Sequence, residues 1–209
     1  MRKPFNIIFL LSILFACISC NSRGKIDDEI RAFYGTHVEL PIDSMTNVSA
    51  SLQTGMYKHA RHIYVMYVDS TSCSDCAISH IGDWSQLNLL NAYKQGTLKY
   101  LFVVAPKHSQ IKHVLDIIRR DTLSSSFVYV DTTSIFERRN PNLPTNKLLH
   151  TFLVDRNWNV ELVGNPIANT EIKSMLKKIV EKEQHTKRQE TQHQLNKKRG
   201  IRKAKGVGN

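Results

Sequence analysis

The sequence lacks the motifs that mark several common classes of enzyme. Its 209 residues contain no Ser-centred nucleophile elbow, no glycine-rich phosphate loop and no zinc-protease helix. Covalent haem attachment needs Cys-x-x-Cys-His, but Ala77 follows Cys76 in the pair Cys73–Cys76. No internal repeat is present. These absences leave the four cysteines as the most informative residues.

Long apolar runs are also scarce, and the N-terminal one is too short to span a bilayer comfortably. Ile7–Ile18 follows a basic start, which is the pattern of a secretory signal peptide and predicts one over residues 1–19. Cys20 follows the small residue Ser19 and precedes a polar tether, residues 20–33, so we expect it to be lipidated. Cys17 is the alternative. Such a lipid would anchor the chain to a membrane without spanning it; an ordinary cleaved signal is the competing interpretation.

Aromatic residues are absent from the C-terminal segment, which is strongly basic. Residues 181–209 hold nine Lys or Arg and three Asp or Glu, so they contribute six of the eleven net positive charges. We expect residues 184–209 to form a disordered tail. A solvated tail without a partner is the favoured interpretation, and contact with acidic lipid is the functional alternative. Nucleic acid is not an expected partner, because single-strand binders interleave aromatic residues with basic ones.

The other two cysteines, Cys73 and Cys76, follow an apolar run and a short polar turn. Residues 62–68 (HIYVMYV) are apolar on both faces, as in a central strand covered on both sides. A helical pattern starts at Cys76. A helix N-terminus carries unpaired N–H groups and partial positive charge, so it stabilises a thiolate. Outside the cytoplasm, two such thiols can form a disulfide.

Strand and helix patterns alternate over residues 34–183, which predicts one α/β domain in the order β-α-β-α-β-(α)-β-β-α. Gly35 is expected to end the first helix, Gly82 to weaken the one after the cysteines, and Ser109 and Thr170 to cap the two that follow. Residues 43–59 are interpreted as a loop. Strands are expected over 36–40, 62–68, 98–105, 127–130, 151–155 and 160–163, and helices over 27–34, from Cys76 to near Gln95-Gly96, after Ser109, over 134–138 and after Thr170.

This order, with Cys-x-x-Cys at the start of the first long helix, resembles the thioredoxin fold. The matching segments are FYG (33–35), VELP (38–41), YVDSTSCSDC (67–76), TFLVD (151–155) and VGNPI (163–167). As a set they are similar to the membrane-tethered thioredoxin-like lipoproteins of Bacteroidota, which are related to TlpA-like thiol–disulfide oxidoreductases. The resemblance implies a central mixed sheet flanked by helices, with Cys73 as the attacking thiol and Cys76 as the resolving thiol.

The resemblance also implies a partner and a location. Protein or small-molecule thiols and disulfides would be the substrates, and no cofactor is expected. The domain would be exported, anchored by lipid to a membrane of a Gram-negative cell envelope, and would face the periplasm or the cell surface.

Several positions depart from the pattern of active thioredoxins. Ser72 stands where they have Trp, and Ser74-Asp75 stand in place of Gly-Pro. Tyr67 occupies the position of a buried Asp. His150 occupies the position of a cis-proline; we predict a trans peptide there, because a cis bond before a residue other than proline costs about 3 kcal/mol.

Four of these residues are candidates to influence the thiols. A hydroxyl of Ser72 or Ser74 can donate a hydrogen bond to the Cys73 thiolate or cap the helix. The charge of Asp75 opposes the thiolate but suits the helix dipole. His150 is a candidate cation beside Cys73.

Two alternatives remain open for the same residues. The disulfide can be a static part of a non-catalytic binding or scaffold module. Cys73, Cys76 and His150 can also supply a soft three-ligand site for copper(I) or zinc. The second is less favoured, because nine histidines are scattered through the chain.

Overall fold

A mixed β-sheet forms the centre of the structure. The computed structural model describes residues 24–48, 60–86, 97–120 and 127–182, together with Thr186, Gln189, Gln192 and Asn196. In this part of the chain, six strands form one sheet in the order β1-β4-β3-β2-β5-β6. The fold is therefore α/β with a mixed sheet, as predicted. The strands are β1 (Thr46–Asn47), β2 (His62–Val68), β3 (Leu98–Val104), β4 (Phe127–Val130), β5 (Thr151–Val154) and β6 (Val160–Val163).

The central strand β2 has the bounds that the sequence predicts, and all but one of its residues are buried. It pairs in parallel with β3 and antiparallel with β5, and β3 pairs in parallel with β4. The carboxyl ends of β2, β3 and β4 therefore meet at one edge of the sheet. Backbone hydrogen bonds continue past that edge, from Ala105 N–H to Val68 O at 2.7 Å and from Asp131 N–H to Val104 O at 2.9 Å.

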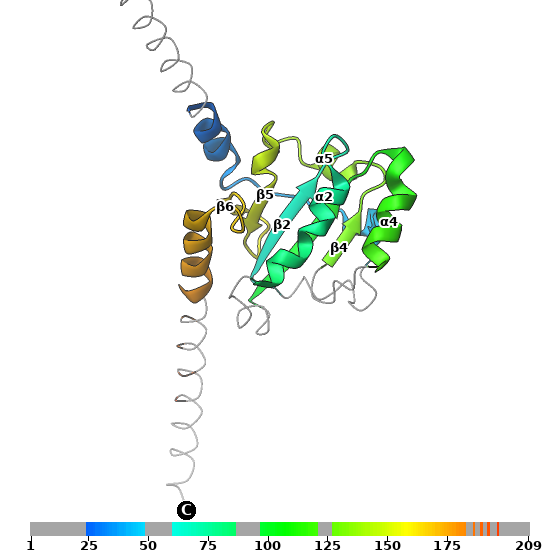
Figure 1. Ribbon diagram of the computed structural model, residues 1–209. Helices are drawn as coiled ribbons and strands as arrows, with labels where there is room; N and C mark the ends of the chain where they lie inside the picture. The colour runs from blue at the N-terminus through cyan, green and yellow to red at the C-terminus, as the bar shows by residue number, and fades with distance from the viewer. Residues whose placement is uncertain are drawn as a thin grey trace, which may run out of the picture.

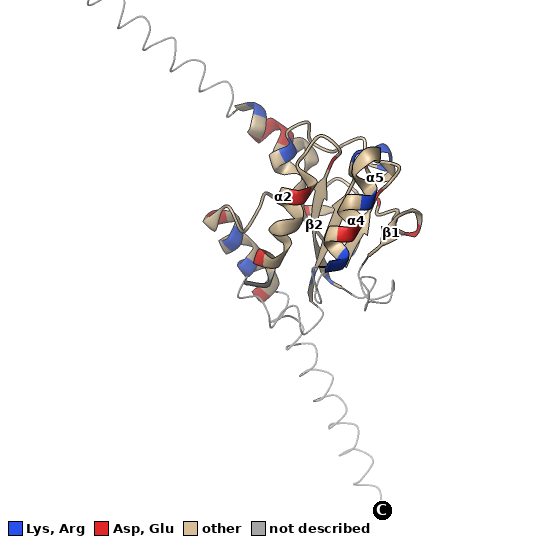
Figure 2. Cartoon of the chain, turned by 45° about the vertical axis from the view of Figure 1, so that its right-hand side comes forward, with Lys and Arg blue, Asp and Glu red and all other residues tan. Residues whose placement is uncertain are grey.

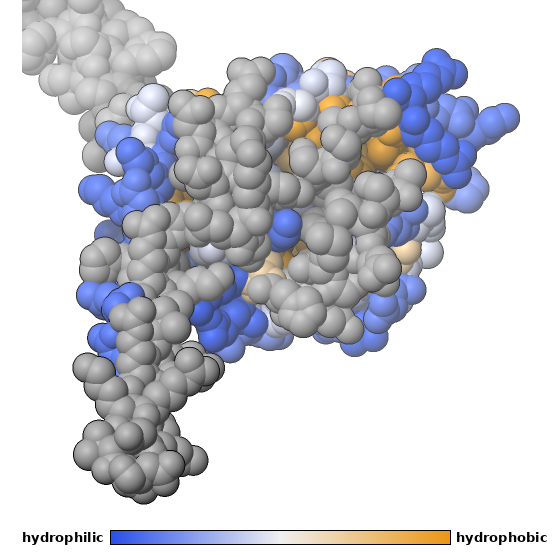
Figure 3. Space-filling model, turned by 90° about the horizontal axis from the view of Figure 1, so that it is seen from below, coloured by the Kyte–Doolittle hydropathy of each residue, from blue (hydrophilic) through white to orange (hydrophobic). Residues whose placement is uncertain are grey.

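Helices cover both faces of the sheet (Figure 1). On one face, α2 (Ser74–Ser79), α4 (Ile111–Arg120) and a helix over residues 170–182 contribute Ile78, Val114 and Leu176 to an apolar cluster. On the other, α5 (Ile135–Arg139) contributes Phe136 to a second cluster. The ribbon of α4 includes both acidic and basic residues (Figure 2). Seen from below, the described surface is hydrophilic around its rim, and hydrophobic residues show between the grey ones (Figure 3).

A helix over residues 24–33 leads into the sheet and ends as predicted at Gly35, whose φ of 77° favours glycine. Its last residue, Phe33, belongs to the core and packs edge-on against Phe152. Glu29 of this helix accepts hydrogen bonds from Thr145 Oγ1 at 3.0 Å and Asn146 N–H at 2.8 Å. The packed part of the chain therefore includes the end of the predicted tether.

The short strand predicted over residues 36–40 is wrong. This segment makes a single bridge, from His37 to Asn159, while Val38 enters the core. The strand at the other edge of the sheet is β1, within a segment predicted to be a loop. It follows a 3-10 turn, Ile42–Ser44. Two residues are too few to show an alternating pattern, so the sequence carries no signal for β1.

Three helix predictions also need correction. The helix at the cysteines starts at Ser74 and ends at Ser79, and a 3-10 helix, Ile81–Gln86, replaces it at the predicted weak point, Gly82. Ser109 lies inside a 3-10 turn, His108–Gln110, so it does not cap α4. The last helix is capped by Asn169, whose Oδ1 accepts the N–H groups of Glu171 and Ile172 at 2.8 and 3.1 Å, and not by Thr170.

Several predictions lie outside the described residues. They are the signal peptide over residues 1–19, the lipidation at Cys20 or Cys17, the helix end near Gln95-Gly96 and most of the basic tail. The four tail residues that are described are helical and exposed. Within the described ranges, no helix is both long and apolar enough to cross a bilayer.

Candidate redox site

Cys73 and Cys76 form a disulfide at the start of α2, where the chain leaves the carboxyl end of β2. Their Cα atoms lie 5.4 Å apart, within the usual range for a disulfide. Cys73 is the N-cap residue of α2, and its Sγ accepts a hydrogen bond from Cys76 N–H at 3.3 Å. A helix N–H therefore already points at the sulfur that would carry negative charge after reduction.

Exposure does not separate the two cysteines, because both are exposed. The resemblance implies that Cys73 attacks and Cys76 resolves. The hydrogen bond that Cys73 Sγ receives is what distinguishes the two sulfurs here. It favours Cys73 as the thiolate, in keeping with the predicted roles.

The serines beside the cysteines do not act on the sulfur. Ser72 Oγ donates to Asp69 Oδ1 at 2.8 Å. Ser74 is buried, and its hydroxyl has no hydrogen-bond partner within the described structure. The expectation that either hydroxyl caps the helix is therefore wrong, because the sulfur of Cys73 is itself the cap. In the disulfide form, neither hydroxyl is hydrogen-bonded to a cysteine sulfur.

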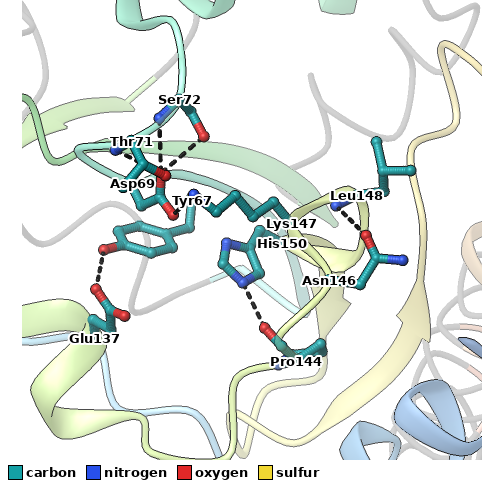
Figure 4. Close-up of polar contacts among 10 residues, drawn as sticks. All are labelled: Tyr67, Asp69, Thr71, Ser72, Glu137, Pro144, Asn146, Lys147, Leu148 and His150. Atoms are coloured by element: carbon teal, nitrogen blue, oxygen red, sulfur yellow. Dashed lines mark hydrogen bonds and ion pairs between the residues drawn. The ribbon is translucent and has the colours of Figure 1, made fainter. Parts of the chain in front are cut away.

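Asp69 organises the turn that leads to Cys73 (Figure 4). Its Oδ1 accepts the N–H and hydroxyl of Thr71 at 3.0 and 2.9 Å, and those of Ser72 at 2.9 and 2.8 Å. Burial alone would raise the pKa of Asp69, but the hydrogen bonds from Lys147, Ser72 and Thr71 outweigh it and hold the pKa well below its ordinary value. Asp69 is therefore a carboxylate at neutral pH.

Lys147 comes from the loop that precedes β5. Its Nζ lies 2.8 Å from Asp69 Oδ2. It begins a 3-10 turn, Lys147–Leu149, which Asn146 caps by accepting Leu148 N–H at 3.1 Å. The same loop thus receives Glu29 of the N-terminal helix on one side and Asp69 on the other.

His150 lies at the end of this loop and belongs to its packing (Figure 4). Its Nε2 is 2.8 Å from Pro144 O, and because a carbonyl only accepts, Nε2 carries the proton. The ring packs against Tyr67, with centroids 5.4 Å apart. No hydrogen bond joins His150 to either sulfur, so its expected role as a cation beside Cys73 is not supported. The described part of the chain contains no cis peptide, as predicted for this position.

The three-ligand metal site is not assembled either. Across the described ranges, no group of three His, Cys, Asp or Glu side chains has a metal-binding arrangement. The buried ring of His150 is held by Pro144 and Tyr67, while both cysteines are exposed at the helix start. The geometry therefore gives no support to a site made of Cys73, Cys76 and His150.

Tyr67 lies at the position where active thioredoxins have a buried Asp, but it cannot act as a base as a carboxylate can. Its hydroxyl donates to Glu137 Oε2 at 3.3 Å. Burial, reinforced by the charges of Glu137, Asp131 and Asp69, raises the pKa of Tyr67. A phenol that stays protonated cannot serve as a base for the thiols near neutral pH.

Asp75, between the cysteines, is joined to a different helix. Its Oδ2 lies 3.0 Å from Nε2 of His113 on α4, and both side chains are more than half exposed. A protonated His113 would offset the charge that opposes a thiolate at Cys73. The sequence analysis did not consider His113.

The central parallel strands, the closing β5–β6 hairpin and a Cys-x-x-Cys disulfide at the helix after β2 together define a thioredoxin-like fold. No family model matches the sequence, and no curated protein matches it. The assignment rests on strand order and on the position of the disulfide.

Several solved structures are similar to the chain at low sequence identity. A thioredoxin-like protein from Bacteroides caccae is 15% identical, with 71% of this chain and 51% of that chain covered and a TM-score of 0.47. The thioredoxin domain of a thiol-disulfide oxidoreductase from Bacteroides vulgatus is 11% identical over 70% and 97%, with a TM-score of 0.45. Yeast Sco1 with copper bound is 13% identical over 70% and 92%, with a TM-score of 0.44. This chain thus spans about half the length of the Bacteroides caccae protein.

The sequence analysis missed two features of the site: the turn held by Asp69, and the partners Lys147 and His113. Only the turn has a recognisable sequence pattern. Asp69 followed by Ser70-Thr71-Ser72 is a typical Asx-turn sequence, because Asp accepts hydrogen bonds from residues two and three positions on. The partners Lys147 and His113 lie 78 and 38 residues from Asp69 and Asp75, so no local pattern indicates them.

Proposed function

We propose that this chain is a thiol–disulfide oxidoreductase that acts through Cys73 and Cys76. The observation that carries the proposal is the exposed disulfide at the start of α2, with the Cys76 N–H donating to Cys73 Sγ. A buried structural disulfide would need no such access. The N–H contact would stabilise the Cys73 thiolate, both as it attacks a substrate disulfide and as it leaves when a substrate thiolate breaks the mixed disulfide.

The exchange needs only the two sulfurs and a substrate. In the reducing direction, the Cys73 thiolate attacks a substrate disulfide; a mixed disulfide forms and one substrate thiolate leaves and takes up a proton. Cys76 then loses its proton and attacks Cys73 Sγ, which releases the second substrate sulfur as a thiol. The substrate gains two electrons and two protons, and Cys73–Cys76 becomes a disulfide. The oxidising direction is the reverse.

The decisive test is to trap the mixed disulfide. Cys76→Ser should accumulate partners linked through Cys73 that are released by reductant, whereas Cys73→Ser should accumulate few. If neither variant captures a partner and the wild-type pair does not exchange with glutathione, the proposal is wrong, and the alternative of a non-catalytic module with a static disulfide is favoured. The reduction potential of the wild-type pair would then separate a reductant from an oxidant.

The proposed location is the surface of a membrane facing the periplasm or the cell exterior. The support is the N-terminal sequence, with a basic start, an apolar run and Cys20 after Ser19. Labelling cells with a fatty-acid probe should mark the wild type and Cys17→Ser but not Cys20→Ser. Labelling that is lost only in Cys17→Ser would move the lipid to Cys17, and no labelling would leave an ordinary cleaved signal.

The basic tail is proposed to touch acidic lipid. The seven net positive charges of residues 184–209 support this over nucleic-acid binding, since the tail has no aromatic residues. Soluble protein that lacks the signal should sediment with phosphatidylserine vesicles in low salt and be released at high salt. Truncation after residue 183 should abolish this binding; binding that survives truncation would contradict a role for the tail.

A further inference from the structure

One carboxylate oxygen fixes the turn between β2 and the cysteines. Four donors from Thr71 and Ser72 converge on Asp69 Oδ1, and Ser72 N–H is also 3.2 Å from the backbone oxygen of Asp69. Ser72 is bonded directly to Cys73. The position of the Cys73 sulfur therefore depends on this turn. The short helix α2 starts at the next residue, Ser74.

The second oxygen of Asp69 ties the turn to another part of the chain. Lys147 Nζ binds Oδ2, and the carboxylate is only 11% exposed while the Lys147 side chain is 46% exposed. Charge-assisted hydrogen bonds of this kind are stronger than neutral ones. The ion pair joins the turn before Cys73 to the loop before β5.

The structure contains a second carboxylate of the same design, which serves as an internal comparison. Asp131 follows β4 as Asp69 follows β2. Its Oδ1 accepts the N–H groups of Thr133 and Ile135 at 3.1 and 3.0 Å, and its Oδ2 accepts that of Phe136 at 2.9 Å. Asp131 thereby holds the start of α5 and not the cysteines. Removing it should loosen the fold without moving Cys73.

We propose that Asp69 is the positioning residue of the redox site: it holds Cys73 where Cys76 can close the disulfide, and Lys147 holds Asp69 in place. The inference rests on the proposed function and extends it to two residues outside the Cys-x-x-Cys motif. Neither residue takes part in a bond that forms or breaks. Their effect is on how readily the two thiols meet.

The measurable consequence is the equilibrium with glutathione. One protein disulfide and two glutathione thiols give one protein dithiol and one glutathione disulfide. A turn that holds Cys73 near Cys76 favours the closed disulfide, because closing then costs less conformational freedom. A looser turn favours the dithiol and raises the equilibrium constant for reduction.

The experiment compares five variants of the full domain. We expect Asp69→Ala to raise the reduction constant about tenfold, which corresponds to about 30 mV towards a less negative potential. Asp69→Asn keeps an oxygen for Thr71 and Ser72 but loses the charge, so a smaller rise of about threefold is expected, and Lys147→Met should match it. Lys147→Arg should restore the wild-type constant, and the control Asp131→Asn should stay within twofold of it.

The outcomes separate the two proposals. A wild type that captures no partner and does not exchange with glutathione would overturn the proposed function, and the role of Asp69 with it. A wild type that exchanges normally, with Asp69→Asn and Lys147→Met both within twofold of it, would overturn the role of Asp69 alone. A shift in Asp131→Asn as large as that in Asp69→Asn would mean that general loosening of the fold is responsible. If Asp69→Ala does not fold, Asp69→Asn, Lys147→Met and its rescue by arginine decide the question.

Discussion

His113 on α4 lies against Asp75, the residue directly before Cys76, with 3.0 Å between Nε2 and Oδ2. The contact crosses between two helices that pack side by side on one face of the sheet. It places an ionisable partner beside the one acidic group inside the Cys-x-x-Cys motif. The charge that the sequence presents as an obstacle to a Cys73 thiolate thus has a counter-charge available.

Replacing His113 should therefore slow the reaction of the reduced thiol. In His113→Gln the Asp75 charge is uncompensated, so the alkylation rate of reduced Cys73 at pH 6 should fall by about twofold, as expected for an exposed ion pair. Asp75→Asn should raise the rate. The exposed His108 provides a control, since His108→Gln should change nothing. Equal rates in His113→Gln, Asp75→Asn and wild type would show that the contact has no influence on Cys73.

Asp69 should make the domain more stable at neutral than at acid pH. Its pKa is lowered in the folded chain, so the carboxylate form stabilises the fold above the ordinary pKa, and this contribution is lost as the pH falls towards the lowered value. In urea, Asp69→Asn should cost about 2 kcal/mol at pH 7 and progressively less below pH 4. Lys147 and Tyr67 face the carboxylate, and Asp131 and Glu137 lie near Tyr67. Because all four are present in both proteins, the difference between them reports on Asp69, and a pH-independent difference would contradict the prediction.

Replacing Ser74 should make the domain more stable. Its hydroxyl is buried without a partner within the described structure, and alanine has the higher helix propensity. Ser74→Ala should raise the free energy of unfolding by about 1 kcal/mol, because an unpaired polar group no longer has to be buried. Ser79→Ala on the same helix removes an exposed hydroxyl that donates to Cys76 O at 2.8 Å, and it should not stabilise. A loss of stability in Ser74→Ala would mean that its hydroxyl has a partner.

Glu29 should hold the N-terminal helix to the loop before β5. The hydrogen bond from Asn146 N–H is the main cause that lowers the pKa of Glu29, with Thr145 and Lys25 contributing in the same direction and burial opposing. Glu29→Gln should therefore increase amide hydrogen exchange over residues 25–33 at neutral pH, whereas Asp27→Asn on the exposed side should not. In the wild type the same increase should appear on acidification, as the carboxylate gains a proton. Unchanged exchange in Glu29→Gln would show that Phe33 alone is enough to dock the helix.

The part of the fold that the sequence predicts is the part with local patterns. Three features belong to this part, because each is determined by residues close together in the chain. They are the uniform apolar run of β2, the alternation of strands and helices, and the β5–β6 hairpin with its turn at Asp155–Asn159. In that turn, Asp155 Oδ1 accepts the N–H groups of Asn157 and Asn159 at 2.8 and 2.9 Å, so the signal is contained in five residues.

The part that could not be predicted depends on pairing across the chain. β1 is defined by its pairing with Tyr129 and Val130 of β4 and by nothing within its own two residues. Ser72 and His150 form hydrogen bonds with Asp69 and Pro144 and not with Cys73. Each polar group pairs with a donor or acceptor that the fold brings near it, and the sequence alone does not show which one that is. The sequence does not indicate that Lys147 pairs with Asp69, since a lysine in a loop usually faces water.

The short segment between Cys20 and the helix over residues 24–33 also limits how far the domain can lie from a lipid at Cys20. Only three residues separate Cys20 from Gly24, the first described residue of the helix, and an extended chain covers at most about 3.6 Å per residue. With the lipid on Cys20 that we propose, the start of the helix would stay within about 14 Å of the anchored residue. The protein would then serve sulfurs presented at the membrane surface, and partners in the open periplasm would have to come to it.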